Sequence, residues 1–311
     1  YYKCAVTTSL LNVDQYPFTD SAAAASAMAT GHKVNWTAVS TSPDGVPYTT
    51  ILEHAKAMGK RTGLVGTDPI SRATPAAFGA HDLSRYNYQS MTDDLLNSSR
   101  PDVMMGGGAT PTAGSDYVSL AQVNTAISLG YQVVYTQAQM DSISNSADKV
   151  LGLFAVMDLA FEVERPAGCT EPHLSEQTAK ALALLENDPD GFFLMVEGAK
   201  IDYGSHNGNI PQITGEVLGF NDAVQVVLDW MRGRNDTLLI VTADHETGGL
   251  VIDHGNGKGN YVTGHFTSPL PLDHTSANVP LYALGSNVSI LDDYIVDGVM
   301  DNTAIFHAMY R

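Results

Sequence analysis

The stretch "GFFLMVEGAKIDYGSH" (residues 191–206) places an apolar run that ends in a glutamate directly before a polar, helix-compatible segment. The run is apolar at successive positions, which is typical of a strand buried on both faces in a parallel sheet. Comparable runs recur at 61–67, 102–107, 149–156, 236–245 and 279–285. Helical patterns separate these runs, at about 49–58, 174–186, 215–232 and 302–310. The alternation predicts an α/β fold, a three-layer sandwich with a large, mostly parallel central sheet and helices on both faces.

Composition limits the class of protein. The 311 residues carry 34 acidic and 16 basic side chains, a formal net charge of −18. This charge argues against a general binder of nucleic acid or membrane surfaces, and no apolar run approaches the roughly 18 residues of a membrane helix. An acidic protein that handles an anion needs local positive charge, which bound metal cations supply, although an acidic surface alone explains the excess equally well. The two cysteines allow one disulfide or two free thiols.

A candidate nucleophile lies in "FTDSAAAASAMATGHK" (residues 18–33). The small residues predict a helix from about Ser21 to Thr30 that ends at Gly31 and packs closely against the sheet. A helix N-terminus attracts phosphate and other oxyanions, so the Ser21 hydroxyl would face a bound anion. The alternative is an ordinary buried helix with Ser21 as its N-cap.

Candidate metal ligands follow the strand candidates, where ligands gather in open α/β sheets. Glu197 ends one run, and Asp202 and His206 come just after it with a spacing of one helical turn. A carboxylate and an imidazole on one side of a helix suit zinc, but such pairs also occur as surface or capping pairs. The short run at 15–18 is a further strand candidate, because it leads directly into the Ser21 segment.

Other candidates are weaker when each is taken alone. Asp244 and His245 follow four β-favouring residues, and His274 precedes the last predicted strand. Thr74 offers an oxygen ligand, and Arg85 offers a forked donor for phosphate or, alternatively, a surface salt bridge. The order and spacing of all these residues therefore carry the inference.

Taken in order, these residues resemble the successive active-site motifs of alkaline phosphatases. The resemblance covers nearly the whole chain and includes "TDSAAAASA", "YTTILEHAKAMGKRTGLVGT", "PDVMMGGG", "KVLGLFAV", "GFFLMVEGAKID" and "GVMDNTAIFHAM". It implies a single alkaline phosphatase-like catalytic domain over 1–311 that is incomplete at its N-terminus. It also implies that the Gly- and Pro-rich excursion at 251–273 is a reduced version of the family's crown region.

The resemblance implies a role for each residue. Ser21 would attack phosphorus in line, and Arg85 would clamp two oxygens of the phosphoryl group. Two zinc ions would lower the pKa of the serine, stabilise the leaving oxygen and deliver a hydroxide to the phosphoserine. A third ion, usually magnesium, would be bound through hard oxygens. The implied ligands are Asp244 and His245 for the first zinc, Asp202, His206 and His274 for the second, and Thr74 and Glu197 for magnesium.

Three features depart from the family pattern. The Asp-Gly-Met-Gly motif, whose aspartate bridges two metal sites, is absent, and the similar string at 297–300 belongs to another motif, so Asp297 is not a substitute. We expect an upstream strand to carry that aspartate. Arg72 stands where relatives commonly carry Asp or His, and its charge would repel the third ion unless it points outward. Tyr203 and Thr247 also lie at positions that vary among relatives.

The expected activity is hydrolysis of phosphate monoesters to alcohol and inorganic phosphate through a phosphoserine. A phosphodiesterase of the same superfamily is the alternative, but Arg85 would crowd the esterified oxygen of a diester. A catalytically silent relative that binds metal or phosphate is a further alternative, which the missing aspartate favours. The expected partners are small phosphorylated substrates, without specific nucleic-acid binding, and a second copy in a homodimer. By resemblance, the location is periplasmic or extracellular.

Overall fold

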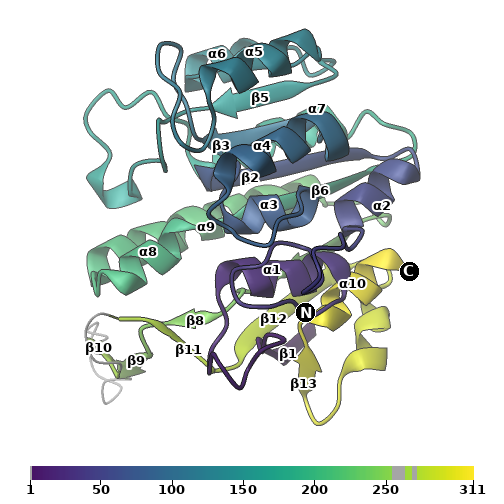
Figure 1. Ribbon diagram of the computed structural model, residues 1–311, viewed down its shortest axis with the longest axis vertical. Coiled ribbons are helices and arrows are strands. Elements are labelled where there is room, and N and C mark those ends of the chain that lie inside the picture. Colours follow the sequence, from purple (N-terminus) through teal and green to yellow (C-terminus); the bar gives the residue numbers. More distant parts are fainter. Residues whose placement is uncertain (1, 254–262, 268–271) are drawn as a thin grey trace.

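A sheet of parallel strands forms the centre of the fold in the computed structural model, which describes residues 2–253, 263–267 and 272–311 (Figure 1). Over these residues the sheet has the strand order β4-β5-β3-β2-β6, and every pairing within it is parallel. The predicted α/β class is therefore confirmed. The strands are β2 (Arg61–Pro69), β3 (Val103–Gly107), β4 (Gln132–Val134), β5 (Val150–Leu153) and β6 (Phe192–Glu197).

A second sheet lies beside β6 and has the order β13-β1-β12-β7 in the described part of the chain. Its strands are β1 (Tyr2–Thr7), β7 (Leu238–Val241), β12 (Val279–Gly285) and β13 (Val299–Asp301). β12 runs antiparallel to both β1 and β7. We predicted that 279–285 is buried on both faces, and this is wrong, because Leu281 is buried whereas Pro280 and Tyr282 are exposed. An antiparallel sheet can leave one face open in this way.

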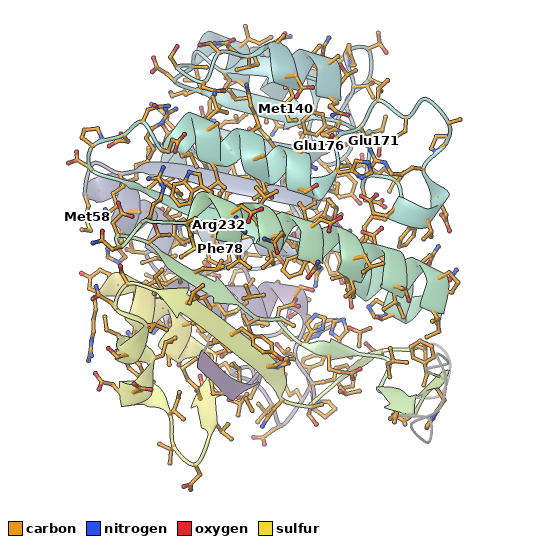
Figure 2. The ribbon with its side chains drawn as sticks, turned by 180° about the vertical axis from the view of Figure 1, so that it is seen from behind. Met58, Phe78, Met140, Glu171, Glu176 and Arg232 are labelled. Atoms are coloured by element: carbon orange, nitrogen blue, oxygen red, sulfur yellow. The ribbon has the colours of Figure 1, made fainter. Side chains whose placement is uncertain are left out.

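Helices cover both faces of the parallel sheet. α3 and α4 lie in front of it in Figure 1, and the view from behind in Figure 2 shows α7 and α9 side by side on the opposite face. The α-helices are α1 (Ser21–Thr30), α2 (Ile51–Ala57), α3 (Ala73–Gly79), α4 (Tyr88–Asp94), α5 (Leu120–Ser128), α6 (Gln137–Ser142), α7 (Leu174–Leu185), α8 (Lys200–His206), α9 (Ile210–Trp230) and α10 (Thr303–Tyr310).

The expected helix boundaries agree with the structure to within two residues except at α9. That helix begins at Ile210, five residues before the expected start. The Asn209 side chain caps it by accepting from the backbone of Gln212, and Pro211 fits the first turn, where its missing N–H is harmless. The run at 15–18, expected as a strand, forms none.

Helix α1 spans the predicted residues and ends at Gly31, whose φ of 75° is the left-handed conformation of a helix C-cap. Ala22 to Thr30 are all buried, which the small side chains permit because neighbouring elements can approach closely. The helices nearest to α1 are α3 and α10, and several buried side chains of α1 belong to the same core cluster as Val6 of β1 and Leu281 of β12.

The excursion predicted at 251–273 lies largely outside the described residues. On its flanks, β9 (Leu250–Asp253) pairs antiparallel with β10 (Thr263–Phe266). The sequence allowed one disulfide or two free thiols, and in the structure Cys4 and Cys169 are free thiols. Within the described residues, no helix has the length and apolar character needed to cross a bilayer.

Candidate active site

The candidate site lies where the carboxyl ends of β6 and β7 approach each other. Each strand is the last of its sheet, and among the described residues β6 pairs with β2 and β7 with β12. Between them is a cavity of about 390 Å³. Apolar side chains line it along both strands, together with Met28 of α1, Phe78 of α3 (labelled in Figure 2) and Phe220 of α9.

The nine residues selected from the sequence meet at this cavity. Ser21, Thr74, Arg85, Glu197, Asp202, Asp244 and His245 line it. The remaining two, His206 and His274, contact Asp202, with Nε2 to carboxylate-oxygen distances of 3.3 Å and 3.7 Å. Residues more than 250 positions apart in the sequence are therefore neighbours, as expected when loops follow the carboxyl ends of strands.

Ser21 is the first residue of α1, and its Oγ lies 3.1 Å from Nε2 of His245. The N-cap is Asp20, whose Oδ1 accepts from the backbone N–H of Ala23 at 3.2 Å. The alternative in which Ser21 caps the helix is therefore wrong, and its hydroxyl remains available to the cavity. Aspartate is a favoured N-cap, so the sequence contained this signal.

Asp20 also holds Arg85, a contact that sequence reasoning missed. Arg85 Nη1 donates to Asp20 Oδ2 at 2.9 Å, and both side chains are largely buried. The backbone N–H of Thr37 donates to Asp20 Oδ1 at 3.1 Å, which fixes the carboxylate further. One aspartate therefore orients the start of the Ser21 helix and the guanidinium that faces the same cavity.

Asp202, His206 and His274 form a group that can hold a metal ion, because one ligand atom from each lies within 4.8 Å of the others. His206 Nδ1 bonds to the carbonyl of Leu272 and His274 Nδ1 to the carbonyl of Thr19, each at 2.7 Å. A carbonyl only accepts, so each Nδ1 carries a hydrogen, and Nε2 is the ring nitrogen that can bind a metal ion when it is deprotonated. This arrangement is typical of metal-binding histidines, and the donor set fits zinc.

The charges in this group favour a cation. Its hydrogen bond with Asp202 raises the pKa of His206 to about 9. Burial opposes ionisation of Asp202, but the hydrogen bond from His206 and the charge of His245 hold its pKa below the usual range. Burial and then the neighbouring charge of His245 lower the pKa of His274, whose ring stacks on that of His245 at 3.6 Å between centroids. Asp202 therefore stays negative and attracts a cation, whereas His274 resists protonation.

Asp244 and His245 form a second donor pair next to the serine. Asp244 Oδ2 lies 3.1 Å from His245 Nε2, the same nitrogen that faces Ser21 Oγ. The Thr247 hydroxyl lies 3.2 Å from His245 Nδ1 and donates to Asp202 Oδ1 at 2.5 Å. Burial opposes charging of both members, yet their interaction raises the pKa of His245 and lowers that of Asp244. The pair thus offers a carboxylate and an imidazole nitrogen at one point, which also fits zinc.

Glu197 and Thr74, the third expected ligand set, lie beside a carboxylate that sequence reasoning did not select, Asp68. Burial and then the charge of Asp68 raise the pKa of Glu197 to about 8, although the Thr74 hydroxyl hydrogen-bonds to it. Asp68 is bonded to Arg72 and to Tyr203. Arg72 therefore neither points to solvent nor lines the cavity.

The absent Asp-Gly-Met-Gly aspartate has no substitute at the similar string. Asp297 is exposed in the turn before β13. β13 is at the edge of its sheet opposite to β7, so this turn is on the wrong side for the cavity.

Comparisons with known proteins agree with this fold. The family model for alkaline phosphatase matches residues 3–270. Alkaline phosphatase 3 of Bacillus subtilis (strain 168) is 39% identical over 239 residues, which cover 75% of this chain and 50% of the relative. The crystal structure of a cold-active alkaline phosphatase from a psychrophilic Shewanella species superposes with a TM-score of 0.86 at 31% identity, covering 99% of this chain and 88% of that one. A mutant of the TAB5 alkaline phosphatase, with Mg bound in its M3 site, gives a TM-score of 0.81 at 27% identity, covering 99% and 87%.

The fold and the gathered carboxylates and histidines define a three-layer α/β protein with a metal-binding group at the ends of its central strands. The chain belongs to the alkaline phosphatase family. This family implies divalent metal ions, and the Asp202 group is suited to bind one. The chain spans about half the length of the Bacillus and Saccharomyces relatives that it matches.

Proposed function

We propose that this protein hydrolyses phosphate monoesters to alcohol and inorganic phosphate through a phosphorylated Ser21. The observation that carries the proposal is the position of Ser21 Oγ at the N-terminus of α1, 3.1 Å from His245 Nε2, in a cavity that Arg85 and Asp244 also line. A helix N-terminus and a guanidinium together bind a phosphoryl dianion. Of the nine candidate residues, Ser21 and Thr74 carry a hydroxyl, and Ser21 is the one at the helix N-terminus.

The side chains of this chain perform the steps as follows. Arg85 holds two non-bridging oxygens of the phosphoryl group while Asp20 keeps the guanidinium in place. The Ser21 Oγ–P bond forms as the ester P–O bond breaks, and the departing alkoxide takes up the proton that the serine gives up. Water then cleaves the Oγ–P bond: its hydroxyl joins phosphorus, which leaves as inorganic phosphate, and its other proton goes to the Ser21 oxygen. The chemistry needs charge stabilisation more than covalent assistance from the protein.

Zinc and magnesium belong to the same proposal. Asp244 with His245, and Asp202 with His206 and His274, would hold two zinc ions, and Glu197 with Thr74 would contribute to a magnesium site. When bound, these ions lower the pKa of attacking oxygens and neutralise charge on the leaving oxygen. Magnesium bound to the TAB5 relative supports a third ion in this family, and the Nδ1 hydrogen bonds of the two histidines support zinc in the Asp202 group.

The cavity between β6 and β7 supports the expectation of a further strand. Both strands border it with an edge that pairs with no other described strand, and their apolar side chains, such as Leu194 and Ile240, are only half-buried. An apolar strand inserted there would bury these side chains and extend towards Glu197 and Asp244. We infer that the bridging aspartate comes from such a strand upstream of residue 1. The N-terminal sequence of the gene product tests this, and a product that begins at Tyr1 contradicts it.

Trapping of labelled phosphate on Ser21 at acidic pH tests the reaction. We expect one labelled serine per chain in the native protein and none in Ser21→Ala, with the metal content unchanged in that variant. Metal binding without label or turnover would favour the catalytically silent alternative. Comparing turnover of a monoester with that of its methyl ester tests the phosphodiesterase alternative, and equal or faster turnover of the diester would overturn our assignment.

Assembly and location follow from the family and are also proposals. We infer an exported, periplasmic or extracellular protein that forms a homodimer and acts on small phosphorylated substrates. Light scattering of the purified protein checks the dimer, and fractionation of the source cells checks the location.

A further inference from the structure

Arg72 is held in a fixed position by one carboxylate and three tyrosines. Its Nε donates to Asp68 Oδ2 at 3.2 Å and to the Tyr203 hydroxyl at 3.1 Å, and its Nη1 donates to the hydroxyls of Tyr88 at 3.3 Å and Tyr117 at 3.4 Å. The guanidinium carbon lies 5.6–6.0 Å from the ring centroids of the same tyrosines. Hydrogen bonds to four side chains, three of which also place their rings around the guanidinium, leave the group little freedom to move.

Asp68 uses only one of its two oxygens in this cluster. Oδ2 accepts from Arg72 and, at 2.7 Å, from the Tyr203 hydroxyl. Asp68 is only 6% exposed, and its Oδ1 has no hydrogen-bond partner among the described residues. A buried acceptor without a partner costs about 1–3 kcal/mol, and more when it is charged. We therefore expect this oxygen to accept from a bound ligand.

A second orphan oxygen belongs to the same cavity. Glu197 Oε2 is buried and finds no partner in the described part of the chain, and Glu197, Asp68 and Thr74 all line the cavity. Asp68 is paired with Arg72, whereas no ion pair within the described residues joins Glu197 to a cation. The next cation, Lys200, is already paired with Asp158. A positively charged ligand would satisfy both orphan oxygens and balance the charge.

The donor atoms select the kind of cation. Asp68, Glu197 and Thr74 offer only oxygens, and no sulfur or imidazole belongs to the set. Magnesium prefers such a set, because it binds through one or two carboxylates and keeps several of its waters. Over the part of the chain that the structure describes, Asp68 and Glu197 are not part of a compact ligand cluster like that of Asp202. A magnesium ion that keeps several waters does not need one, because the waters can bridge the ion to more distant carboxylates.

We propose that Asp68 completes a magnesium site with Glu197 and Thr74, and that Arg72 is a positioning residue that holds Asp68 in the orientation this site needs. The proposal rests on the proposed function, which places Thr74 and Glu197 at a magnesium site. It reverses the expectation that Arg72 repels the ion, because the guanidinium binds Oδ2 and leaves Oδ1 without a partner among the described residues.

Magnesium binding to the zinc-loaded protein tests the role of Asp68. Calorimetric titration with MgCl₂ and elemental analysis should find one magnesium per native chain, and Asp68→Asn should weaken binding at least tenfold. Asp158→Asn is the matched control, since it removes a nearby carboxylate that is paired with Lys200, and it should stay within threefold of native. No magnesium bound by the native protein, or equal affinities in the native protein and Asp68→Asn, overturns the proposal.

Arg72→Gln separates positioning from repulsion. If Arg72 orients Asp68, the variant binds magnesium more weakly, by a factor on the order of the 10–100-fold seen for outer-shell partners. If Arg72 repels the ion, the same variant binds magnesium more tightly, and the proposal is overturned. The double variant Asp68→Asn/Arg72→Gln removes the ion pair as a unit, so it guards against misfolding, and it should bind as weakly as Asp68→Asn. Because calorimetry reads binding alone, these outcomes are independent of phosphate trapping on Ser21.

Discussion

Arg85 Nη1 donates to Asp20 Oδ2 at 2.9 Å, and the other oxygen of Asp20 caps helix α1, which begins at Ser21. The phosphate clamp and the nucleophile that we propose are therefore fixed by one carboxylate. Neither depends on a flexible side chain alone, since Asp20 is itself buried and bonded to the backbone of Thr37. Because both groups bond to Asp20, their positions relative to each other are fixed.

Replacement of Asp20 should separate its two tasks. Asp20→Ala and Asp20→Ser both remove the buried pair with Arg85, but serine keeps a capping oxygen, so the free energy of unfolding of Asp20→Ser should exceed that of Asp20→Ala by about 1 kcal/mol. Both variants release Arg85, so both should weaken inhibition by inorganic phosphate about tenfold, or about 1.4 kcal/mol. Denaturant titration and phosphate inhibition constants check this. Tighter phosphate binding in either variant would mean that the charge of Asp20 matters more than the tether.

Loss of a histidine from the Asp202 group should reduce the stabilisation by metal. Zinc that binds only the folded chain stabilises it by about 2.7 kcal/mol at a hundred times its Kd, so a chelator should lower the Tm of the native protein. His274→Ala removes one ligand and should shrink both this shift and the zinc content. His307→Ala is the control, because His307 is exposed on α10. An unchanged zinc content in His274→Ala would exclude the residue as a ligand.

Residues such as Thr74 and Arg85 were selected through the family resemblance, whereas the apolar runs themselves predicted the parallel sheet and the ligands that follow its strands. Glu197 and Asp244 illustrate this, as each follows an apolar run and both line one cavity. The open face of the second sheet was missed, because an apolar strand of seven residues does not show whether a layer covers both of its faces.

The contacts that orient the site were also beyond sequence reasoning. Asp20 and Arg85 are 65 positions apart, and Arg72 and Tyr203 are 131 apart. Such pairs depend on how α1, α3 and α8 pack, and local patterns carry no information on that packing. The Asp20 cap had a local signal, but Asp68 had none, since an aspartate near the end of a strand more often begins a turn.

The ion pair between His81 and Glu53 should make stability depend on pH. Burial opposes the charge, but the hydrogen bond that His81 Nε2 donates to Glu53 Oε1, at 3.1 Å, raises the pKa of His81 above that of the unfolded chain. A raised pKa adds stability that is complete below about pH 6.5 and is lost as the pH rises through the folded pKa.

Comparison of two variants isolates this pair. Stability of the metal-free protein should fall above pH 6.5 by at most about 1.4 kcal/mol per pH unit for this one proton. His81→Gln should lose that component, while His307→Gln should keep it, and other groups such as His206 contribute equally to all three proteins. Denaturant titrations from pH 5.5 to 9 measure the difference. Parallel pH profiles for His81→Gln and the native protein would show that the pair does not couple protonation to folding.

The C-terminal end of the Ser21 helix depends on a close approach at Gly31. Its φ is 75°, and an added Cβ would lie 2.8 Å from Phe306 Cδ1 of α10. Gly168 has a similar φ of 79° but nothing within 4 Å of an added Cβ. Gly168→Ala should therefore carry only the conformational cost of about 1 kcal/mol, and Gly31→Ala should carry a further 1–3 kcal/mol, roughly, from overpacking. Equal changes in the free energy of unfolding would mean that α10 moves away from α1 without cost, and would contradict the tight packing on which the position of Ser21 depends.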